Sequence, residues 1–383
     1  MSTIKFTTFN SWYSFSMTGK GSLIINGVKV DGDLSSECIR SFSNTSTNDA
    51  TPAVFEIVGD ITKFWCYYLR TLEISKDSNM ESLVCAYAGQ NPKLDVSKLI
   101  KLKDLTCTGS MLTSLNVSGC SSLESLNCEG NSTLTSLDVS GLSKLKVLKC
   151  NENSLTELKM KGCYSLEVLI CNQNQLSSLD LSSLSTSLPI SSARTKRPIG
   201  HAEPILEELG IIEYPTFSFG DHIPKPVFLE LFQKGRSQLK CLFCGRNLLT
   251  TLDISKCINL ETLDCSYNPF KSLKLKGFGL REIYFGNNEL ETVDLIECLK
   301  LETIYYCIPP NPKSLNLSGH SRIKYLYYED RYTYRDALPF LDVSGCSSLE
   351  IIQDRTLNQS RIKEMDVAGC TSLKKVKYVD ALP

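Results

Sequence analysis

The stretch Leu145-Lys-Val-Leu148-Lys-Cys150-Asn-Glu-Asn153-Ser-Leu155 decides the fold of this 383-residue chain. Its residues follow the frame L-x-x-L-x-C-x-x-N-x-L. Leu148 and Cys150 are two positions apart, so both face the same side of a short strand, because strand side chains alternate. Asn153 falls in the turn after this strand, where its amide can bond the backbone groups that a tight coil leaves unpaired. The stretch therefore predicts a short strand with an apolar inner face, followed by a tight turn.

The same frame returns along the chain at a fixed period. The cysteines of the frame are separated by 22, 21, 22 and 21 residues, and they are Cys85, Cys107, Cys128, Cys150 and Cys171. Cys244 and Cys265 repeat the spacing, and the aromatic residues Phe285, Tyr306 and Tyr328 then take the cysteine position. Between copies runs a second half such as Leu341-Asp-Val-Ser-Gly-Cys346. One repeat cannot bury its apolar face alone, so the period predicts a stack of repeats that bury one continuous interior.

These motifs resemble bacterial leucine-rich repeats of the cysteine-ladder internalin kind, and related repeats in surface proteins of gut Bacteroidetes, over about residues 61–383. The resemblance implies an α/β-type repeat, namely a right-handed solenoid with a parallel concave β-sheet and about 14 rungs of roughly 21–22 residues. It also implies that the concave sheet binds a partner, as in adhesion at a cell surface, and that the chain is not an enzyme. It says little about the ligand, because such surfaces bind unrelated partners.

Two regions depart from the repeat. Residues 1–60 contain strand-like runs such as Val54-Phe-Glu-Ile-Val58, and we expect them to form a small N-terminal β cap over the first rung of a solenoid spanning 61–383. At about 182–238 the period breaks, which predicts an irregular insertion. Within it, Leu206-Glu-Glu-Leu209-Gly-Ile211 still fits the frame and predicts one degenerate rung.

Several classes of function are excluded by composition and motifs. A formal charge of -1 does not fit a nucleic-acid binder, and no window approaches the roughly 20 apolar residues of a transmembrane helix. The cysteine spacing matches no zinc site, and His201, His222 and His320 are scattered. His320 occupies the position that Cys346 holds in another repeat, so it is interpreted as a structural substitute. We therefore expect no catalytic residue, no metal and no cofactor.

The outward positions of the strands carry the candidate site. Tyr284, Tyr305 and Tyr327 precede the ladder position of consecutive repeats, and Tyr325 lies two residues before Tyr327. Strands about 4.8 Å apart would bring these tyrosines into one aromatic patch, and exposed aromatic clusters often anchor interfaces. With Phe243, this patch is predicted to bind a protein or glycan ligand. Cross-strand aromatic stacking also stabilises a sheet without any ligand, so a purely structural role stays open.

The alternative function is assembly. The last repeat ends close to the C-terminus, and its Leu373, Val376 and Tyr378 would form a C-terminal edge through which the chain self-associates. The compartment is not decided by the cysteines, because buried thiols survive in either redox setting. An extracellular or cell-surface location is expected if a signal has been removed, and a cytoplasmic one if the chain is complete.

Overall fold

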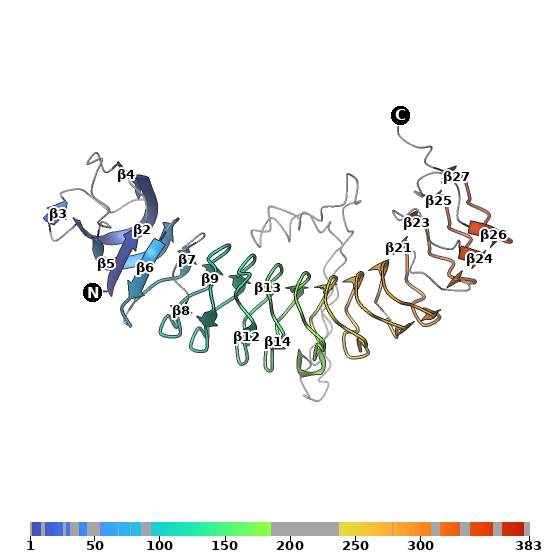
Figure 1. Ribbon diagram of the computed structural model, residues 1–383, viewed down its shortest axis with the longest axis horizontal. Helices are drawn as coiled ribbons and strands as arrows, with labels where there is room; N and C mark the ends of the chain where they lie inside the picture. Colours follow the sequence, from blue (N-terminus) through green and yellow to red (C-terminus); the bar gives the residue numbers. More distant parts are fainter. Residues whose placement is uncertain are drawn as a thin grey trace, which may run out of the picture. The chain divides into compact units, whose positions relative to one another are not determined.

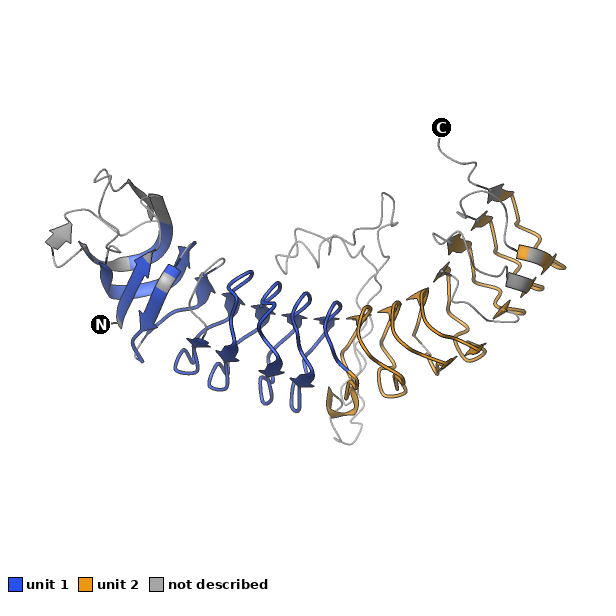
Figure 2. Cartoon of the chain, viewed as in Figure 1, with its two compact units in different colours: residues 1–176 blue, residues 177–383 orange. Residues whose placement is uncertain are grey.

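The computed structural model describes residues 2–8, 12–25, 28–30, 38–43, 54–67, 69–76, 78–85, 93–184, 237–277, 279–307, 315–329, 338–354 and 362–378. These residues fall into two compact units, residues 1–176 and 177–383 (Figures 1 and 2). Each unit is a coil of short strands. The predicted rung at Ile211, together with His201 and His222, lies outside the described residues.

The first unit begins with an antiparallel sheet, drawn in dark blue in Figure 1. Its strands are β1 (Ser2–Thr8), β2 (Trp12–Ile25), β3 (Val28–Val30), β4 (Cys38–Ser43), β5 (Val54–Cys66) and β6 (Leu69–Ile74). Strand β5 pairs antiparallel with β1 and β2, and its last residues pair in parallel with β7 (Ser82–Val84). The predicted boundary at residue 60 thus falls inside one strand, which joins the antiparallel sheet to the first repeat.

Four phenylalanines fill the interior of this antiparallel sheet. The rings of Phe6 and Phe55 stack at 4.8 Å, and Phe6 meets Phe15 edge to face at 5.3 Å and Phe64 at 5.1 Å. All four side chains are buried. This aromatic core lies next to the first ladder residue, Cys66, which is also buried. Such packing is what a cap over the first repeat requires, and the N-terminal β cap stays a prediction.

Parallel strands three residues long follow in the first unit. The main-sheet strands, which carry the L-x-x-L-x-C frame, are β7, β9 (Asp104–Thr106), β11 (Ser125–Asn127), β13 (Val147–Lys149) and β15 (Val168–Ile170). They pair in exact repeat register, with Leu126 beside Leu105 and Leu148. The intervening halves form short strands on the other side of the coil, namely β8 (Lys93–Asp95), β10 (Ser114–Asn116), β12 (Ser136–Asp138) and β14 (Glu157–Lys159). The sequence predicted the first set, and the structure adds the second.

The second unit repeats this plan after a 3-10 helix, η1 (Ser182–Leu184). Its main-sheet strands are β16 (Cys241–Phe243), β17 (Thr262–Asp264), β19 (Glu282–Tyr284), β21 (Thr303–Cys307), β23 (Tyr325–Glu329), β25 (Ile351–Asp354) and β27 (Lys375–Tyr378). The strands on the other side are β18 (Ser272–Lys274), β20 (Thr292–Asp294), β22 (Leu315–Asn316), β24 (Leu338–Asp342) and β26 (Ile362–Asp366). The parallel β-solenoid predicted from the repeat is confirmed.

The interior of both units is a ladder of leucines and cysteines. Leu148 and Cys150 are completely buried, as are Leu263 and Cys265 in the second unit. Phe285, Tyr306 and Tyr328 replace cysteine in the later repeats and remain buried, with ring centroids 4.9 and 5.9 Å apart. Each ladder residue thus lies where the alternation of the strand predicted it, and the wider aromatic side chains continue the same interior.

The asparagines of the frame tie each turn to its neighbour. Asn153 accepts a hydrogen bond from the Asn131 backbone N–H at 2.7 Å, and its Nδ2 donates to the carbonyls of Cys150 at 2.8 Å and Cys128 at 3.2 Å. Asn268 donates to the equivalent carbonyls in the second unit, Cys244 O and Cys265 O, and its Oδ1 accepts from the Leu249 N–H. The predicted role in the turn is confirmed, and each asparagine in addition bonds two successive repeats.

A second polar ladder follows the L-D-V-S half. Cys346 donates its thiol hydrogen to the Leu317 carbonyl at 3.2 Å, and Cys120 and Cys163 do the same to carbonyls of the preceding repeat. His320 takes this position in its own repeat, with its Nε2 3.0 Å from the Leu295 carbonyl and its Nδ1 3.0 Å from the Leu317 carbonyl. The interpretation of His320 as a structural substitute is therefore confirmed.

Candidate partner-binding face

Three tyrosines form a continuous stack on the outward face of the second unit's main sheet. Tyr284, Tyr305 and Tyr327 are paired with one another across β19, β21 and β23. The ring centroids of Tyr284 and Tyr305 are 4.2 Å apart with an angle of 4° between the planes, and those of Tyr305 and Tyr327 are 4.7 Å apart at 8°. Their neighbours Ile283, Ile304 and Leu326 point to the interior. The alternation of the strands therefore aligns the three rings on one face.

The remaining predicted site residues lie at unequal distances from this stack. Tyr325, on the same strand as Tyr327, has its ring centroid 6.3 Å from that ring and extends the patch. Phe243 lies beyond the other end, because Asp264 on β17 separates it from Tyr284 in the strand register. We call Tyr284, Tyr305, Tyr325 and Tyr327 the tyrosine row. The structure brings these four together and places Phe243 two strands from the nearest of them.

Two buried carboxyl groups adjoin the tyrosine row. Glu282 and Asp264 occupy outward positions on β19 and β17, yet their exposed fractions are 8% and 4%. Burial raises the pKa of Glu282 to about 7, and the hydrogen bond from the Tyr284 hydroxyl lowers it only in part. Burial raises the pKa of Asp264 to about 6, against the opposing effects of hydrogen bonds from Ser266 and the charge of Arg246. Both groups thus change charge near neutral pH.

Neither carboxyl group was among the site residues predicted from the sequence. The available signal was an acidic residue two positions before Tyr284 in the same strand, which must point the same way. The burial that raises the pKa of Glu282 could not be predicted from the sequence, because the side chain becomes buried only when neighbouring strands pack. The Glu282–Tyr284 hydrogen bond in turn favours the protonated form of the tyrosine, and the pKa of Tyr284 is raised by burial first and by the Glu282 charge second.

The stacked geometry limits which chemical groups the tyrosine row can offer. Both faces of the Tyr305 ring are covered, one by Tyr284 and one by Tyr327. Part of each side chain is still accessible, but the Tyr305 hydroxyl oxygen is buried and the Tyr284 hydroxyl donates to Glu282, so ring edges are the main groups left for a partner. Ring edges carry the positive part of the aromatic quadrupole and attract carbonyl oxygens and other ring faces. The arrangement suits polar and aromatic contacts of a protein surface.

The described residues contain no candidate metal site, and their ladder thiols are protonated. Within those residues, no group of three or more His, Cys, Asp and Glu side chains could hold a metal ion. The ladder cysteines are neutral thiols, since burial raises the pKa of Cys85 and of Cys171 to about 12. A protonated thiol is a poor nucleophile and a poor ligand. No helix in the described part of the chain is long and apolar enough to cross a membrane.

Comparison with known proteins yields structural similarities only. No family model matches the sequence, and no curated protein matches it. Among solved structures, the functional domain of InlJ from Listeria monocytogenes, whose description includes a cysteine ladder, is 22% identical with a TM-score of 0.42, and the match covers 73% of this chain and 54% of that one. The leucine-rich-repeat protein LIC12759 of Leptospira interrogans is 16% identical with a TM-score of 0.31, over 75% and 74% of the two chains. The repeat, the strand register and the buried cysteines of the chain itself make it a leucine-rich-repeat solenoid with a cysteine ladder.

Proposed function

We propose that this chain is a non-enzymatic recognition protein that binds a protein partner through the tyrosine row. The observation that carries the proposal is the stack of Tyr284, Tyr305 and Tyr327, with Tyr325 beside it, on the outward face of a rigid sheet. Tyrosine is enriched at interfaces because its ring is large and its hydroxyl is polar. Stacked rings have little rotamer freedom left to lose, so binding costs less ordering entropy.

A protein partner is favoured over a glycan by the same geometry. A sugar ring binds an aromatic side chain by stacking on an open ring face, and Tyr305 has neither face open. Ring edges instead match the carbonyl oxygens and rings of a protein surface. The proposed role resembles that of an adhesion protein, with the partner held on the main sheet.

The experiment compares the wild type with a Tyr305→Ser/Tyr325→Ser/Tyr327→Ser variant. Partners are captured from a cell-surface protein extract and, in parallel, on an array of mucin glycans, and the captured protein is then purified for Kd measurement. Tyr164→Ser is the matched control, because Tyr164 is an exposed tyrosine of the first unit and is not part of the row. Circular dichroism confirms that each variant is folded.

A purified protein whose Kd rises at least tenfold for the triple variant and is unchanged for Tyr164→Ser supports the proposal. A Tyr305→Phe/Tyr325→Phe/Tyr327→Phe variant then separates the contribution of the stacked rings from that of the hydroxyls. Equal affinity of wild type and triple variant would remove the tyrosine row as the binding face. Capture on the glycan array alone would replace the protein partner by a sugar.

A second candidate, self-association at the C-terminal edge, has one observation in its favour. Leu373 and Val376 in the last described repeat are partly exposed, whereas Leu349 and Ile352, at the same positions one repeat earlier, are completely buried. Sedimentation of the chain over a range of concentrations tests this candidate. A dimer that dissociates on Val376→Lys would support self-association, and not partner binding, as the function of the chain.

A further inference from the structure

From Glu81 onward, each described repeat carries a charged residue at one position, and its sign alternates along each unit, whereas the repeat before Glu81 has Thr62 there. This position lies directly after the first leucine of the L-x-x-L-x-C frame. In the first unit the residues at this position are Glu81, Lys103, Glu124, Lys146 and Glu167. In the second unit they are Lys240, Glu261, Arg281, Glu302, Lys324, Glu350 and Lys374. We call these two rows the charge ladder.

Successive members of the charge ladder are direct neighbours in space. The backbone N–H of each donates to the backbone carbonyl of the member one repeat earlier, for example Glu124 to Lys103 and Lys146 to Glu124, both at 2.8 Å. In the second unit the same bonds run from Arg281 to Glu261 at 2.9 Å and from Glu302 to Arg281 at 2.8 Å. The alternation therefore belongs to the folded structure and is not only a pattern along the sequence.

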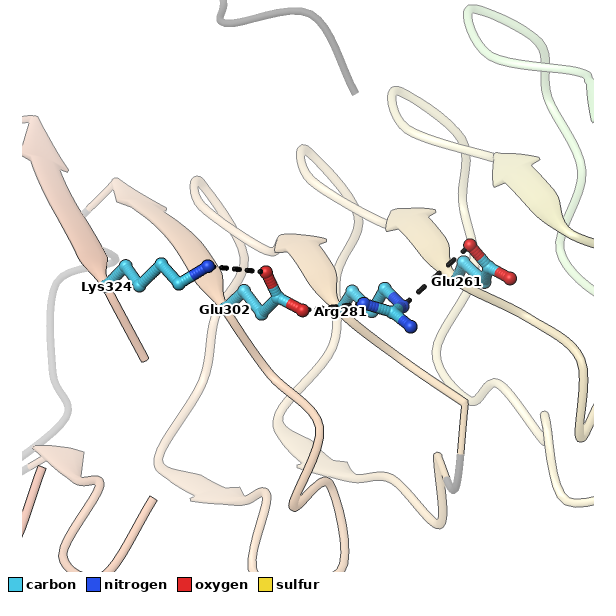
Figure 3. Close-up of polar contacts among 4 residues, drawn as sticks. All are labelled: Glu261, Arg281, Glu302 and Lys324. Carbon is cyan, nitrogen blue, oxygen red and sulfur yellow. Dashed lines mark hydrogen bonds and ion pairs between the residues drawn. The ribbon is translucent and has the colours of Figure 1, made fainter. Parts of the chain in front are cut away.

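The side chains of successive members form ion pairs. Figure 3 shows the central part of the row, in which the Arg281 guanidinium lies between two carboxylates, with Nη1 2.6 Å from Glu302 Oε1 and Nε 4.0 Å from Glu261 Oε2. Glu302 also holds Lys324 through its other oxygen at 3.3 Å. In the first unit Lys103 pairs with Glu81 at 2.9 Å and Lys146 with Glu124 at 2.6 Å. Opposite charges thus meet at consecutive contacts from Glu261 to Lys324, and at the Glu81–Lys103 and Glu124–Lys146 contacts of the first unit.

The apolar interior cannot distinguish one repeat from the next in the same way. Leu105, Leu126 and Leu148 are interchangeable, and so are Cys107, Cys128 and Cys150, because all are buried at identical positions. A repeat that stacks out of order, within one chain or between two chains, still buries the same kind of interior. Misassembly of this kind is the characteristic failure of repeat proteins. A stack displaced by one repeat, however, would bring Glu124 against Glu81.

We propose that the charge ladder fixes the order in which the repeats stack, by allowing favourable contacts only between repeats of opposite sign. The backbone structure is the same in each repeat, whereas the sign of the charge is the same only in every second repeat. A displacement by one repeat brings like charges together at the contact where it occurs, and a displacement by two repeats does not. Exposed ion pairs contribute little to the stability of a correct fold, so discrimination between folds is the larger effect.

Two deletions in the first unit test this parity directly. Removal of residues 103–123 joins Leu102 to Glu124 and leaves the L-x-x-L frame intact, with Glu124 stacked on Glu81. Removal of residues 103–145 joins Leu102 to Lys146, again in frame, with Lys146 stacked on Glu81. Both are made in the full chain, refolded from urea, and assayed for native monomer by size-exclusion chromatography with light scattering.

The larger deletion is expected to give a severalfold higher yield of native monomer than the smaller one, against the trend that chain size alone would set. Adding Glu124→Gln to the smaller deletion, or refolding it in about 1 M salt where the screening length is ~3 Å, should recover much of the difference. Equal yields, or a higher yield for the smaller deletion, would overturn the proposal.

The intact chain provides a second test, which holds even when both deletions fail to fold. One variant neutralises the first unit's ladder with Glu81→Gln, Lys103→Gln, Glu124→Gln, Lys146→Gln and Glu167→Gln. Its matched control inverts every sign with Glu81→Lys, Lys103→Glu, Glu124→Lys, Lys146→Glu and Glu167→Lys. The inverted ladder should refold with nearly the wild-type yield, and the neutral ladder should form several times more misassembled dimer at a similar Tm. A neutral ladder that refolds as cleanly as the inverted one would contradict the proposal.

Discussion

The hydroxyl of Tyr284 donates a hydrogen bond to the Glu282 carboxylate on the same strand, with 2.8 Å between Tyr284 Oη and Glu282 Oε1. The two side chains are neighbours because residues two apart on a strand share a face. The bond joins the end of the tyrosine row to a buried carboxyl group whose pKa lies at about 7. Tyr284, a member of the candidate binding face, is therefore bonded directly to Glu282, the carboxyl group expected to make the stability of the fold depend on pH.

The stability of the chain should fall as the pH rises from about 5 to about 8. A carboxyl group with a pKa of about 7 in the folded state, against a usual value of 4.5, binds its proton more tightly when folded, so unfolding releases protons in this window. Glu282→Gln removes the buried charge and should raise the free energy of unfolding at pH 8 by on the order of 2 kcal/mol, with little change at pH 5. Urea denaturation at both pH values measures it, and Glu157→Gln, at an exposed glutamate, is the control. A Glu282→Gln chain with the wild-type pH dependence would refute this assignment.

Loss of one frame asparagine should destabilise the fold strongly. Asn153→Ala removes a side chain that satisfies the Asn131 N–H and the carbonyls of Cys128 and Cys150, all in the interior. The buried Asn131 N–H then loses its acceptor, whereas the carbonyls of Cys128 and Cys150 keep donors from Asn131 and Asn174, so the expected cost is about 2 kcal/mol. The midpoint of urea denaturation checks this value, and Asn116→Ala, at an exposed position, should cost less than ~0.5 kcal/mol. Similar costs for the two variants would argue against the bridging role.

The position of His320 should accept a cysteine and reject a leucine. His320→Cys restores the thiol that Cys298 and Cys346 carry at this position, where each donates to a carbonyl of the preceding repeat. His320→Leu fills the space but removes the ring nitrogens that contact the carbonyls of Leu295 and Leu317, which keep only their other donors, at a cost of about 1 kcal/mol. Thermal denaturation of the two variants side by side decides the matter, and a leucine variant as stable as the cysteine variant would contradict it.

Among the cysteines whose side chains the structure describes, only Cys370 should react quickly with an alkylating reagent. Its thiol is partly exposed, whereas the others are buried. Burial raises the pKa of Cys128 to about 12, so almost no thiolate is present there at neutral pH. Alkylation of the native chain for minutes at pH 7.5, followed by peptide mass spectrometry, measures the modification at each site. Equally fast modification of Cys128 and Cys370 would show that the ladder opens in solution.

The repeat itself, its strands and the burial of its ladder could be predicted from the sequence. A period of 21 or 22 residues and the L-x-x-L-x-C frame determine which side chains point inward, because alternation along a strand is a local property. The tyrosine row was predicted for the same reason, from its position in the frame. The asparagine position was also predicted, since its spacing from the strand is constant.

Only the tertiary structure decided the relations between strands. The near-parallel stacking of Tyr284 on Tyr305, the separation of Phe243 from the row by Asp264 and the raised pKa of Glu282 all depend on which side chains become neighbours across the sheet. The alternating charges of the charge ladder can be read from the sequence. Its members, however, are about 20 residues apart along the chain and interact only when the repeats stack. The sequence by itself determined which way each side chain faces, and the packing determined what each side chain meets, because desolvation and Coulomb interaction act through space and not along the chain.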